Sequence, residues 1–466
     1  MSSAGSSKRP GQILMGLLAW GALSFGAVYP WAYWPLAIGC LGLGVWAVLL
    51  SEPWRDPRST ALAASLMAVA AAMVLQLIPL PAGITNYISP ARQAFFERFQ
   101  VGYQPASFQS LSIDPAITWV TLALFVTFAL LLVGLGRALR VVTLDWLIHG
   151  LMGLGVVLAL FGIVQHSMID EVRPLVYGFW KPRDGGHVFG PFINRNHFAG
   201  WMVMVLPVVI GYSCGVVGAL RLPAQRGWKD WMHWGISVEA NRFLLASGAI
   251  LVMGASLVLT QSRSGMLGFA VGVAIVALFV VARATRPMVR ALALVYCAGL
   301  LVGAVMWAGA SNTVNRFAEA PSAVEGRLAA WRDATNIIGD FPIVGTGLGT
   351  FGEAMLVYQT GNRELMYAQA HNDYIQLAAE GGLLVVVPAF VAIVLLSRAI
   401  QRRMASADDD ILTSWVRVGA VAGLAGIAVQ SVMEFSLQMP GNTMMFVVIA
   451  ALAMHRPRRM SRAHRI

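Results

Sequence analysis

The chain has 466 residues, of which 58% are hydrophobic and only 12% are charged. Globular domains are about 45–50% apolar and about 25% charged, so this composition excludes an ordinary soluble protein and indicates that most of the surface faces lipid. The formal net charge of +11 would suggest nucleic acid as the partner of a soluble protein. In a membrane protein the same excess anchors cytoplasmic segments, so we expect no nucleic-acid partner.

Crossing about 30 Å of hydrocarbon as a helix takes roughly 20 mostly apolar residues, and twelve stretches of the chain qualify. The sequence therefore predicts an all-α, polytopic membrane protein with about 12 transmembrane helices. In chain order the predicted spans are 12–28, 32–50, 61–80, 116–136, 147–166, 198–219, 243–261, 265–282, 288–309, 383–399, 413–432 and 441–455.

Basic residues predict the orientation of these spans. With the N-terminus inside, the inner segments hold 22 of the 33 basic residues but only 8 of the 22 acidic ones. Cytoplasmic segments carry an excess of lysine and arginine, and an even number of spans leaves both ends of the chain on one side. We therefore expect both termini to be cytoplasmic.

The predicted outer face carries the long connections, at 81–115, 167–197 and 310–382. They divide the chain into membrane helices 1–9 (residues 1–309), a large, partly helical outer loop (310–382), and helices 10–12 with a basic tail (383–466). Long ordered loops are usually functional, so the chemistry is expected on the outer face.

The first polar group, Asn194, Arg195, Asn196 and His197, lies at the outer mouth of span 198–219. An exposed helix N-terminus has free N–H groups and partial positive charge, and an adjacent arginine would complete an anion site. Interfacial snorkelling of Arg195 with Asn194 as the helix cap explains the same residues. Both interpretations stay open for this segment.

Arg263 stands between Ser262 and Ser264 in a turn too short to leave the membrane surface. Burying a guanidinium there costs several kcal/mol unless an anion or an acid compensates the charge. Arg263 is therefore expected either to contact an anionic ligand or to pair with an acid such as Glu434.

The large outer loop opens with a predicted helix over 323–338, in which Leu328, Trp331, Thr335 and Ile338 would form the packed stripe. Two arginines of this helix, at 327 and 332, are five residues apart, so at most one points into a site. The glycines of 345–352 could cradle phosphate, but the Lys-Ser/Thr of a P-loop is missing. A tight turn or close backbone packing explains these glycines better.

His371 is the sharpest candidate, because it ends the longest outer loop just before an apolar helix. A histidine near a carboxylate suits general-base chemistry at neutral pH, although isolated histidines are often structural. Adjacent side chains do not meet on a helix, so Asp373 could be an N-cap, with Glu380 or another acid orienting His371. No motif suits a metal ion, and no cofactor is expected; fixed cations would replace a metal at a phosphate-bearing substrate.

Taken together, these motifs resemble the O-antigen ligase and polymerase superfamily of bacterial envelope glycan enzymes. The resemblance is best over 190–390, where order, spacing and side of the membrane agree. Its motifs are Asn194-Arg-Asn-His-Phe-Ala-Gly200, Ser262-Arg-Ser-Gly265, Glu325-Gly-Arg327 with Trp331, Gly345-Thr-Gly-Leu-Gly349 and His371-Asn-Asp373.

The resemblance implies an inner-membrane enzyme that moves a glycan from undecaprenyl diphosphate to an acceptor hydroxyl on the periplasmic face, with inversion and without a metal. Arg195 and Arg263 would correspond to the family's arginines that hold the diphosphate. His371 would correspond to the loop histidine proposed to deprotonate the acceptor. The further substrate-binding candidates are Asn194, Asn196, His197, Arg327, Arg332 and Asp373.

Within the superfamily the acceptor distinguishes the activities. A ligase transfers to lipid A core, a polymerase to another lipid-linked repeat, and a protein O-oligosaccharyltransferase to pilin-like proteins. The single dominant outer loop with its histidine favours a ligase slightly. A secondary transporter also fits twelve spans, but its polar residues would lie at mid-membrane in two related halves, whereas here they gather at outer ends.

Overall fold

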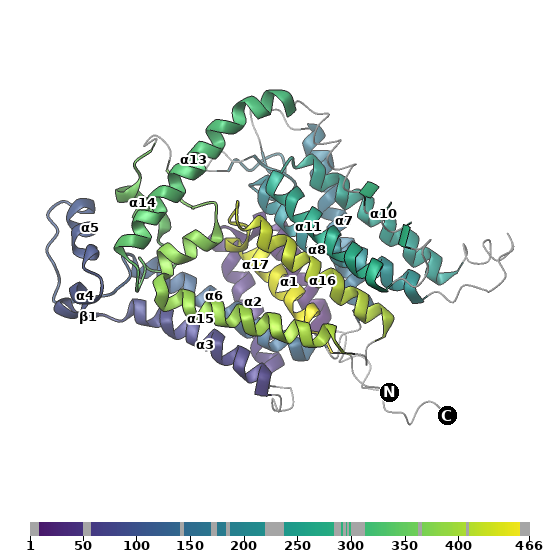
Figure 1. Cartoon of the computed structure of the whole chain (residues 1–466), viewed down its shortest axis with the longest axis horizontal. Coiled ribbons are helices and arrows are strands. Elements are labelled where there is room, and N and C mark those ends of the chain that lie inside the picture. The colour runs from purple at the N-terminus through teal and green to yellow at the C-terminus, as the bar shows by residue number, and fades with distance from the viewer. Residues whose placement is uncertain are drawn as a thin grey trace.

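In the computed structural model the described residues are 9–49, 57–139, 144–168, 175–182, 187–219, 237–283, 290–291, 295, 298–299, 313–361, 366–406 and 410–456. Within them the protein is a bundle of long helices that carries smaller helices and a two-stranded sheet at one end (Figure 1).

Nine helices of the described ranges are long and apolar enough to cross a membrane. Each coincides with one of the predicted spans, which confirms the prediction of an all-α, polytopic membrane protein. These helices are α2 (Pro30–Leu49), α3 (Pro57–Leu77), α6 (Pro115–Ala138), α7 (Leu144–Met168), α8 (Arg195–Ala219), α10 (Val238–Leu259), α11 (Arg263–Arg283), α15 (Asp373–Met404) and α16 (Ile411–Gln430).

Two of the other three predicted spans are shorter in the structure than predicted. The first and last correspond to α1 (Arg9–Leu23) and α17 (Pro440–Ala453), which have only 15 and 14 residues, fewer than the roughly 20 that cross a bilayer. Nearly all of α17 is buried, and it packs against α16, α6 and α1. The predicted span 288–309 lies mostly outside the described residues, so a total of twelve spans stays a prediction.

The centre of the bundle is α8, in which every residue from His197 to Ser213 is buried. Small residues let α8, α11 and α16 approach one another closely, as in other membrane helix pairs. A Cβ on Gly423 of α16 would lie 2.4 Å from the Met204 carbonyl oxygen of α8, and one on Gly268 of α11 would lie 2.5 Å from the Gly426 carbonyl oxygen of α16. This packing fixes the outer ends of the three helices relative to one another.

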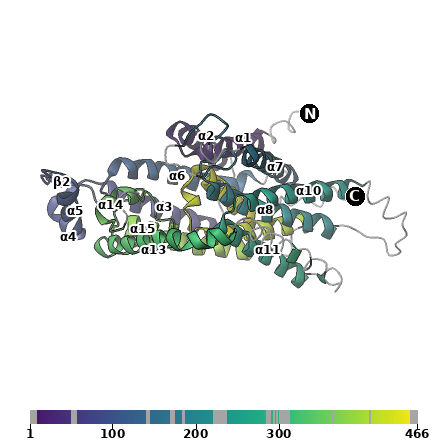
Figure 2. The ribbon, with the colours of Figure 1, turned by 90° about the horizontal axis from the view of Figure 1, so that it is seen from above.

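The predicted loop 81–115 folds into a small unit at the far end of the molecule (Figures 1 and 2). Two short strands pair antiparallel at its base, with Leu80 opposite Gln109. The unit consists of β1 (Leu80–Pro81), α4 (Ala82–Ile88), α5 (Ala91–Phe99) and β2 (Phe108–Gln109).

The predicted loop 310–382 contains two helices, α13 (Thr313–Asp340) and α14 (Phe351–Tyr358). The helix α13 contacts α15. Within α15, Gly382 has φ 54° and ψ −169°, a conformation that other residues rarely adopt. This kink separates an outer segment, 373–381, from the long apolar part of α15.

The predicted helix 323–338 lies within α13, but only part of its predicted packed stripe is confirmed. Trp331 and Ile338 are partly buried, and Ile338 packs against the cluster of α5 and α14 side chains, whereas Leu328 and Thr335 are exposed. The buried face instead contains Ala330, Ala334 and Ile337, so it is rotated around the helix axis from the predicted one.

Candidate functional site

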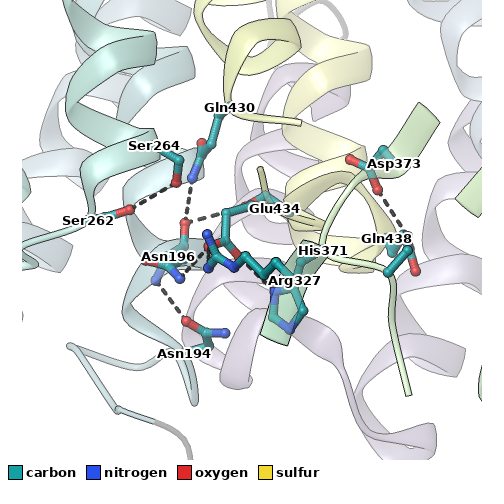
Figure 3. A network of polar contacts seen from close by, with 12 residues as sticks. Asn194, Asn196, Ser262, Ser264, Arg327, His371, Asp373, Gln430, Glu434 and Gln438 are labelled. Atoms are coloured by element: carbon teal, nitrogen blue, oxygen red, sulfur yellow. Dashed lines mark hydrogen bonds and ion pairs between the residues drawn. The ribbon is translucent and has the colours of Figure 1, made fainter. Parts of the chain in front are cut away.

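Segments from four parts of the chain meet around Glu434, which lies in the turn between α16 and α17 (Figure 3). Asn196 comes from the start of α8 and Arg327 from α13. His371 directly precedes Asn372, the N-cap of α15. The turn itself continues into the short helix η2 (Ser436–Gln438). The bundle therefore brings together polar residues up to 238 positions apart in the sequence.

The two carboxylate oxygens of Glu434 have different partners. Oε1 accepts a hydrogen bond of 2.7 Å from Asn196 Nδ2 and forms an ion pair of 2.7 Å with the Arg327 guanidinium. Oε2 lies 3.4 Å from His371 Nδ1. Only 1% of the Glu434 side chain is exposed, so one buried carboxylate orients an amide, a guanidinium and an imidazole.

Burial alone would raise the pKa of the Glu434 carboxyl, because it disfavours the charged form. The hydrogen bond from His371 and the positive charge of Arg327 act in the opposite direction and outweigh burial. The pKa of Glu434 therefore lies below its ordinary value, and the group is an anion at neutral pH.

His371 is fixed in an unusual backbone conformation, with φ 50°. Trp331 of α13 donates a 2.8 Å hydrogen bond to the carbonyl oxygen of Ala370, immediately before it. On the other side, the Asn372 side chain caps α15 and the Asp373 N–H donates to the Ser431 carbonyl oxygen at 2.9 Å. Non-glycine residues rarely have positive φ, and such strain occurs at functional sites.

Phe435 separates the two histidines of the site. Its ring meets those of His197 and His371 edge to face, with centroids 4.7 and 4.9 Å apart. His197 is buried, and its carbonyl oxygen accepts a hydrogen bond from Asn442 of α17. His371 is partly exposed, so of these two imidazoles it is the one that a substrate can reach.

The start of α8 is held against the turn that contains Glu434. The Asn194 side chain accepts a 2.8 Å hydrogen bond from the Asn196 N–H, which confirms the predicted helix cap. The Asn196 carbonyl oxygen accepts hydrogen bonds from Gln430 and Ser436. Arg195, between these asparagines, is the first residue of α8 and is partly exposed.

Arg263 is likewise the first residue of its helix, α11, and its side chain is exposed. The Ser262 hydroxyl accepts a hydrogen bond from the Gly265 N–H at 3.2 Å. A Cβ on Gly265 would lie 2.7 Å from the Ala199 Cβ, so the first turns of α8 and α11 are in contact. Glu434, which the sequence offered as a partner for Arg263, forms an ion pair with Arg327.

The structure separates the other predicted site residues. Arg327 binds Glu434, whereas the Arg332 side chain is exposed, in line with the prediction that at most one arginine points into the site. Asp373 accepts a hydrogen bond of 3.0 Å from Gln438. The prediction that Asp373 could cap α15 is wrong, because Asn372 accepts the hydrogen bonds from the first free N–H groups.

The glycine-rich turn 345–349 binds a carboxylate of the chain itself. The N–H groups of Gly349 and Phe351 donate to Glu380 at 2.8 and 3.1 Å. A Cβ on Gly345 would lie 2.2 Å from the Glu380 carbonyl oxygen. Close backbone packing is therefore the role of this turn, and Glu380 is the acid it encloses, not the acid beside His371.

Sequence reasoning missed Glu434 as the centre of the site. The signal was present, since Glu434 is the single acid between the last two apolar stretches and an acid there needs a compensating partner. Its partners, however, could not be identified without the packing of α13 and α15 against the turn.

A comparison with protein families gives a match to the O-antigen ligase family over residues 248–390. This region contains Arg263, Arg327 and His371, while Arg195 and Glu434 lie outside it. A search of curated proteins gives no match.

Proposed function

We propose that this membrane protein, which matches the O-antigen ligase family over residues 248–390, transfers a glycan from undecaprenyl diphosphate to an acceptor hydroxyl. The reaction would take place on the periplasmic face of a bacterial inner membrane, with both termini of the chain in the cytoplasm. The positive-inside distribution of basic residues supports this orientation.

The observation that carries the proposal is the contact of His371 with the buried Glu434 carboxylate. With the Nδ1 proton directed to Oε2 at 3.4 Å, the lone pair of the imidazole is on Nε2, away from the acid. An anion beside Nδ1 fixes this tautomer and stabilises the imidazolium that forms when Nε2 accepts a proton. His371 is thus the general base, and Glu434 is its positioning residue.

The arginines at the starts of α8 and α11 are the proposed diphosphate contacts. Two adjacent helix N-termini contribute partial positive charge, and Arg195 and Arg263 add two guanidinium groups, which suit tetrahedral phosphate oxygens. Both side chains are accessible to a ligand at the outer ends of their helices. These fixed charges act on the diphosphate in the way a divalent metal ion would, so the proposal needs no metal.

The proposed reaction is a single displacement at the anomeric carbon. The acceptor oxygen forms the new glycosidic bond as its proton passes to His371, and the bond from the anomeric carbon to the diphosphate oxygen breaks. Undecaprenyl diphosphate leaves with the electron pair of that bond. Preorganised cations stabilise the charge that develops on the leaving oxygen more than water does.

The acceptor separates a ligase from a polymerase or a protein O-oligosaccharyltransferase. The test is transfer from a defined undecaprenyl-diphosphate-linked glycan, with lipid A core, a second lipid-linked repeat and a pilin peptide offered side by side to purified protein in lipid. We expect transfer to one acceptor, with the ligase outcome favoured. If the protein binds the donor but transfers to none of the three, the proposed function is wrong.

A further inference from the structure

One turn of α13 contacts both halves of the pair formed by His371 and Glu434, which we name the dyad. Arg327 and Trp331 are four residues apart in α13, so their side chains lie on the same face of the helix. Arg327 forms the 2.7 Å ion pair with Glu434 (Figure 3). Trp331 donates the 2.8 Å hydrogen bond to the carbonyl oxygen of Ala370. The same helix face therefore holds the acid and the backbone that carries the imidazole.

The direct contact between the two residues of the dyad is longer than either of these. His371 Nδ1 lies 3.4 Å from Oε2 of Glu434, whereas hydrogen bonds from nitrogen to oxygen in proteins are usually about 2.7–3.2 Å long. The two residues also lie 63 positions apart in the chain. A long contact between separate segments does not fix the imidazole against the carboxylate, so neighbouring groups must set the geometry of the dyad.

The segment that carries His371 is held at Ala370, which is 0% exposed. The Ala370 N–H donates to the Gln376 side chain at 3.0 Å, and its carbonyl oxygen, which Trp331 binds, belongs to the peptide bond that joins it to His371. The φ angle of His371 describes how that peptide bond is turned about the N–Cα bond of the histidine. This angle is 50°, a conformation that persists only where the surroundings enforce it. The Trp331 hydrogen bond therefore acts on the peptide bond whose orientation is strained.

A further contact brings α13 against the same segment. A Cβ on Gly326 would lie 3.3 Å from the hydroxyl oxygen of Tyr367, four residues before His371. The contacts of Gly326, Arg327 and Trp331 all fall within residues 326–331. The part of α13 that docks on the segment before α15 is thus the part that meets the dyad.

We propose that this turn of α13 assembles the dyad, with Arg327 positioning the Glu434 carboxylate and Trp331 positioning the backbone of His371. Both are positioning residues, which act through the dyad and do not touch the substrate. The inference rests on the proposed function for the role of His371 as the base. It assigns the Arg327 guanidinium to the acid and not to the diphosphate.

The first test is Trp331→Phe, which keeps an aromatic ring and removes the N–H donor. Without this hydrogen bond the peptide bond before His371 can relax, and the imidazole is free to turn away from Glu434. We expect kcat for glycan transfer to fall about tenfold, since one such hydrogen bond contributes up to about that factor to an equilibrium. The KM for the donor should change by less than about threefold.

The second readout is nitrogen-15 NMR of histidine-labelled protein in lipid, which does not depend on transfer. The chain has 8 histidines, and the signal of His371 is the one that disappears in His371→Ala. For the neutral imidazole we expect the Nδ1–H tautomer in wild type and a mixture of both tautomers in Trp331→Phe. A loss of stability without displacement of the imidazole would leave this signal unchanged.

Trp20→Phe is the matched control, because the Trp20 indole also donates to a backbone carbonyl oxygen, that of Ala32, at 2.9 Å. It removes the same kind of hydrogen bond from another part of the fold, and should leave kcat and the His371 signal at their wild-type values. Arg327→Gln is the second variant of the proposed pair. It should lower kcat at least about tenfold, give the same mixture of tautomers, and change the donor Kd by less than about threefold.

Unchanged kcat and an unchanged His371 signal in Trp331→Phe would overturn the inference, as would equal losses of kcat in Trp331→Phe and Trp20→Phe. If Trp331→Phe does not fold, the same two readouts in Arg327→Gln decide. A weaker donor Kd with wild-type kcat in Arg327→Gln would also overturn it, because the guanidinium would then contact the substrate. A wild-type protein that transfers no glycan, but whose His371 signal changes in Trp331→Phe, would refute the proposed function alone.

Discussion

The role of Glu434 can be tested by Glu434→Gln, which keeps the size of the side chain and removes its charge. The amide oxygen can still accept a hydrogen bond from Asn196 or Arg327, but the group beside His371 no longer carries a negative charge. The preferred tautomer and the stabilisation of the imidazolium are both lost. We therefore expect a loss in turnover and a smaller change in donor binding.

General-base catalysis contributes about 10²–10⁴-fold to a rate, and the substitution keeps the imidazole while misorienting it. We expect kcat to fall about 10²–10³-fold, and KM for the lipid-linked donor to change by less than about threefold. The Glu434 side chain is 1% exposed, so replacing its hydrogen bonds to charged partners should also cost about 1–3 kcal/mol of stability.

The assay is steady-state transfer from a defined undecaprenyl-diphosphate glycan, combined with thermal unfolding in the same lipid. Glu380→Gln is the matched control, because Glu380 is also buried but binds the backbone of the glycine-rich turn and Gln376. It should lower stability with a much smaller loss in kcat. If both variants lose stability and kcat in the same proportion, the dyad of Glu434 and His371 has no catalytic role.

Four further outcomes follow from the same site. His371→Ala should abolish transfer while the protein still inserts and binds donor, and normal turnover would refute the general-base role. Arg195→Ala and Arg263→Ala should each raise the donor Kd about tenfold or more, whereas Arg332→Ala, on the exposed face of α13, should leave it unchanged; full donor affinity in both site variants would refute the diphosphate contacts. Transfer should persist in excess EDTA, and a loss reversed by added metal would contradict the proposed role of fixed cations. Because the pKa of Glu434 is lower in the folded protein than its ordinary value, its ion pair contributes its full stabilisation above that ordinary pKa, and the contribution disappears as pH falls through the folded pKa. Thermal unfolding between pH 7 and 3.5 should therefore show a smaller acid-induced decrease in Glu434→Gln than in wild type, and equal decreases would contradict the pKa direction.

The positions of the long helices could be predicted from the sequence because lipid imposes a simple requirement. A lipid-facing helix needs an apolar run of a given length, and nine predicted spans have that length in the described residues. The requirement does not hold for α17, which is enclosed by other helices. The 14 residues of α17 are apolar because other helices bury them, not because they face lipid. Hydropathy alone does not distinguish these two environments, so it predicted a full membrane span here.

The packed face of α13 could be predicted only in part. The prediction chose Leu328, Trp331, Thr335 and Ile338; Ile338 packs against the neighbouring cluster, but Leu328 and Thr335 are exposed. The buried residues Ala334 and Ile337 belong to the cluster that contains Phe351 and Met355 of α14, so contact with α14 determines which face is buried. The identity of those neighbours depends on α14, whose position cannot be derived from the pattern of α13.

The sequence picks out some members of the candidate site more readily than others, for one physical reason. Arg195, Arg263 and His371 could be found because each is a polar residue at the outer end of an apolar helix, and that position can be read locally. Glu434 has the same local pattern, but the sequence could offer it only as one possible partner of Arg263, because an ion pair is decided by which helices are neighbours. Once α13 lies on α15, Arg327 reaches Oε1 and leaves Oε2 for His371. The two oxygens of one buried carboxylate are thus divided between a guanidinium of α13 and the imidazole before α15, an arrangement that only the packing of these helices determines.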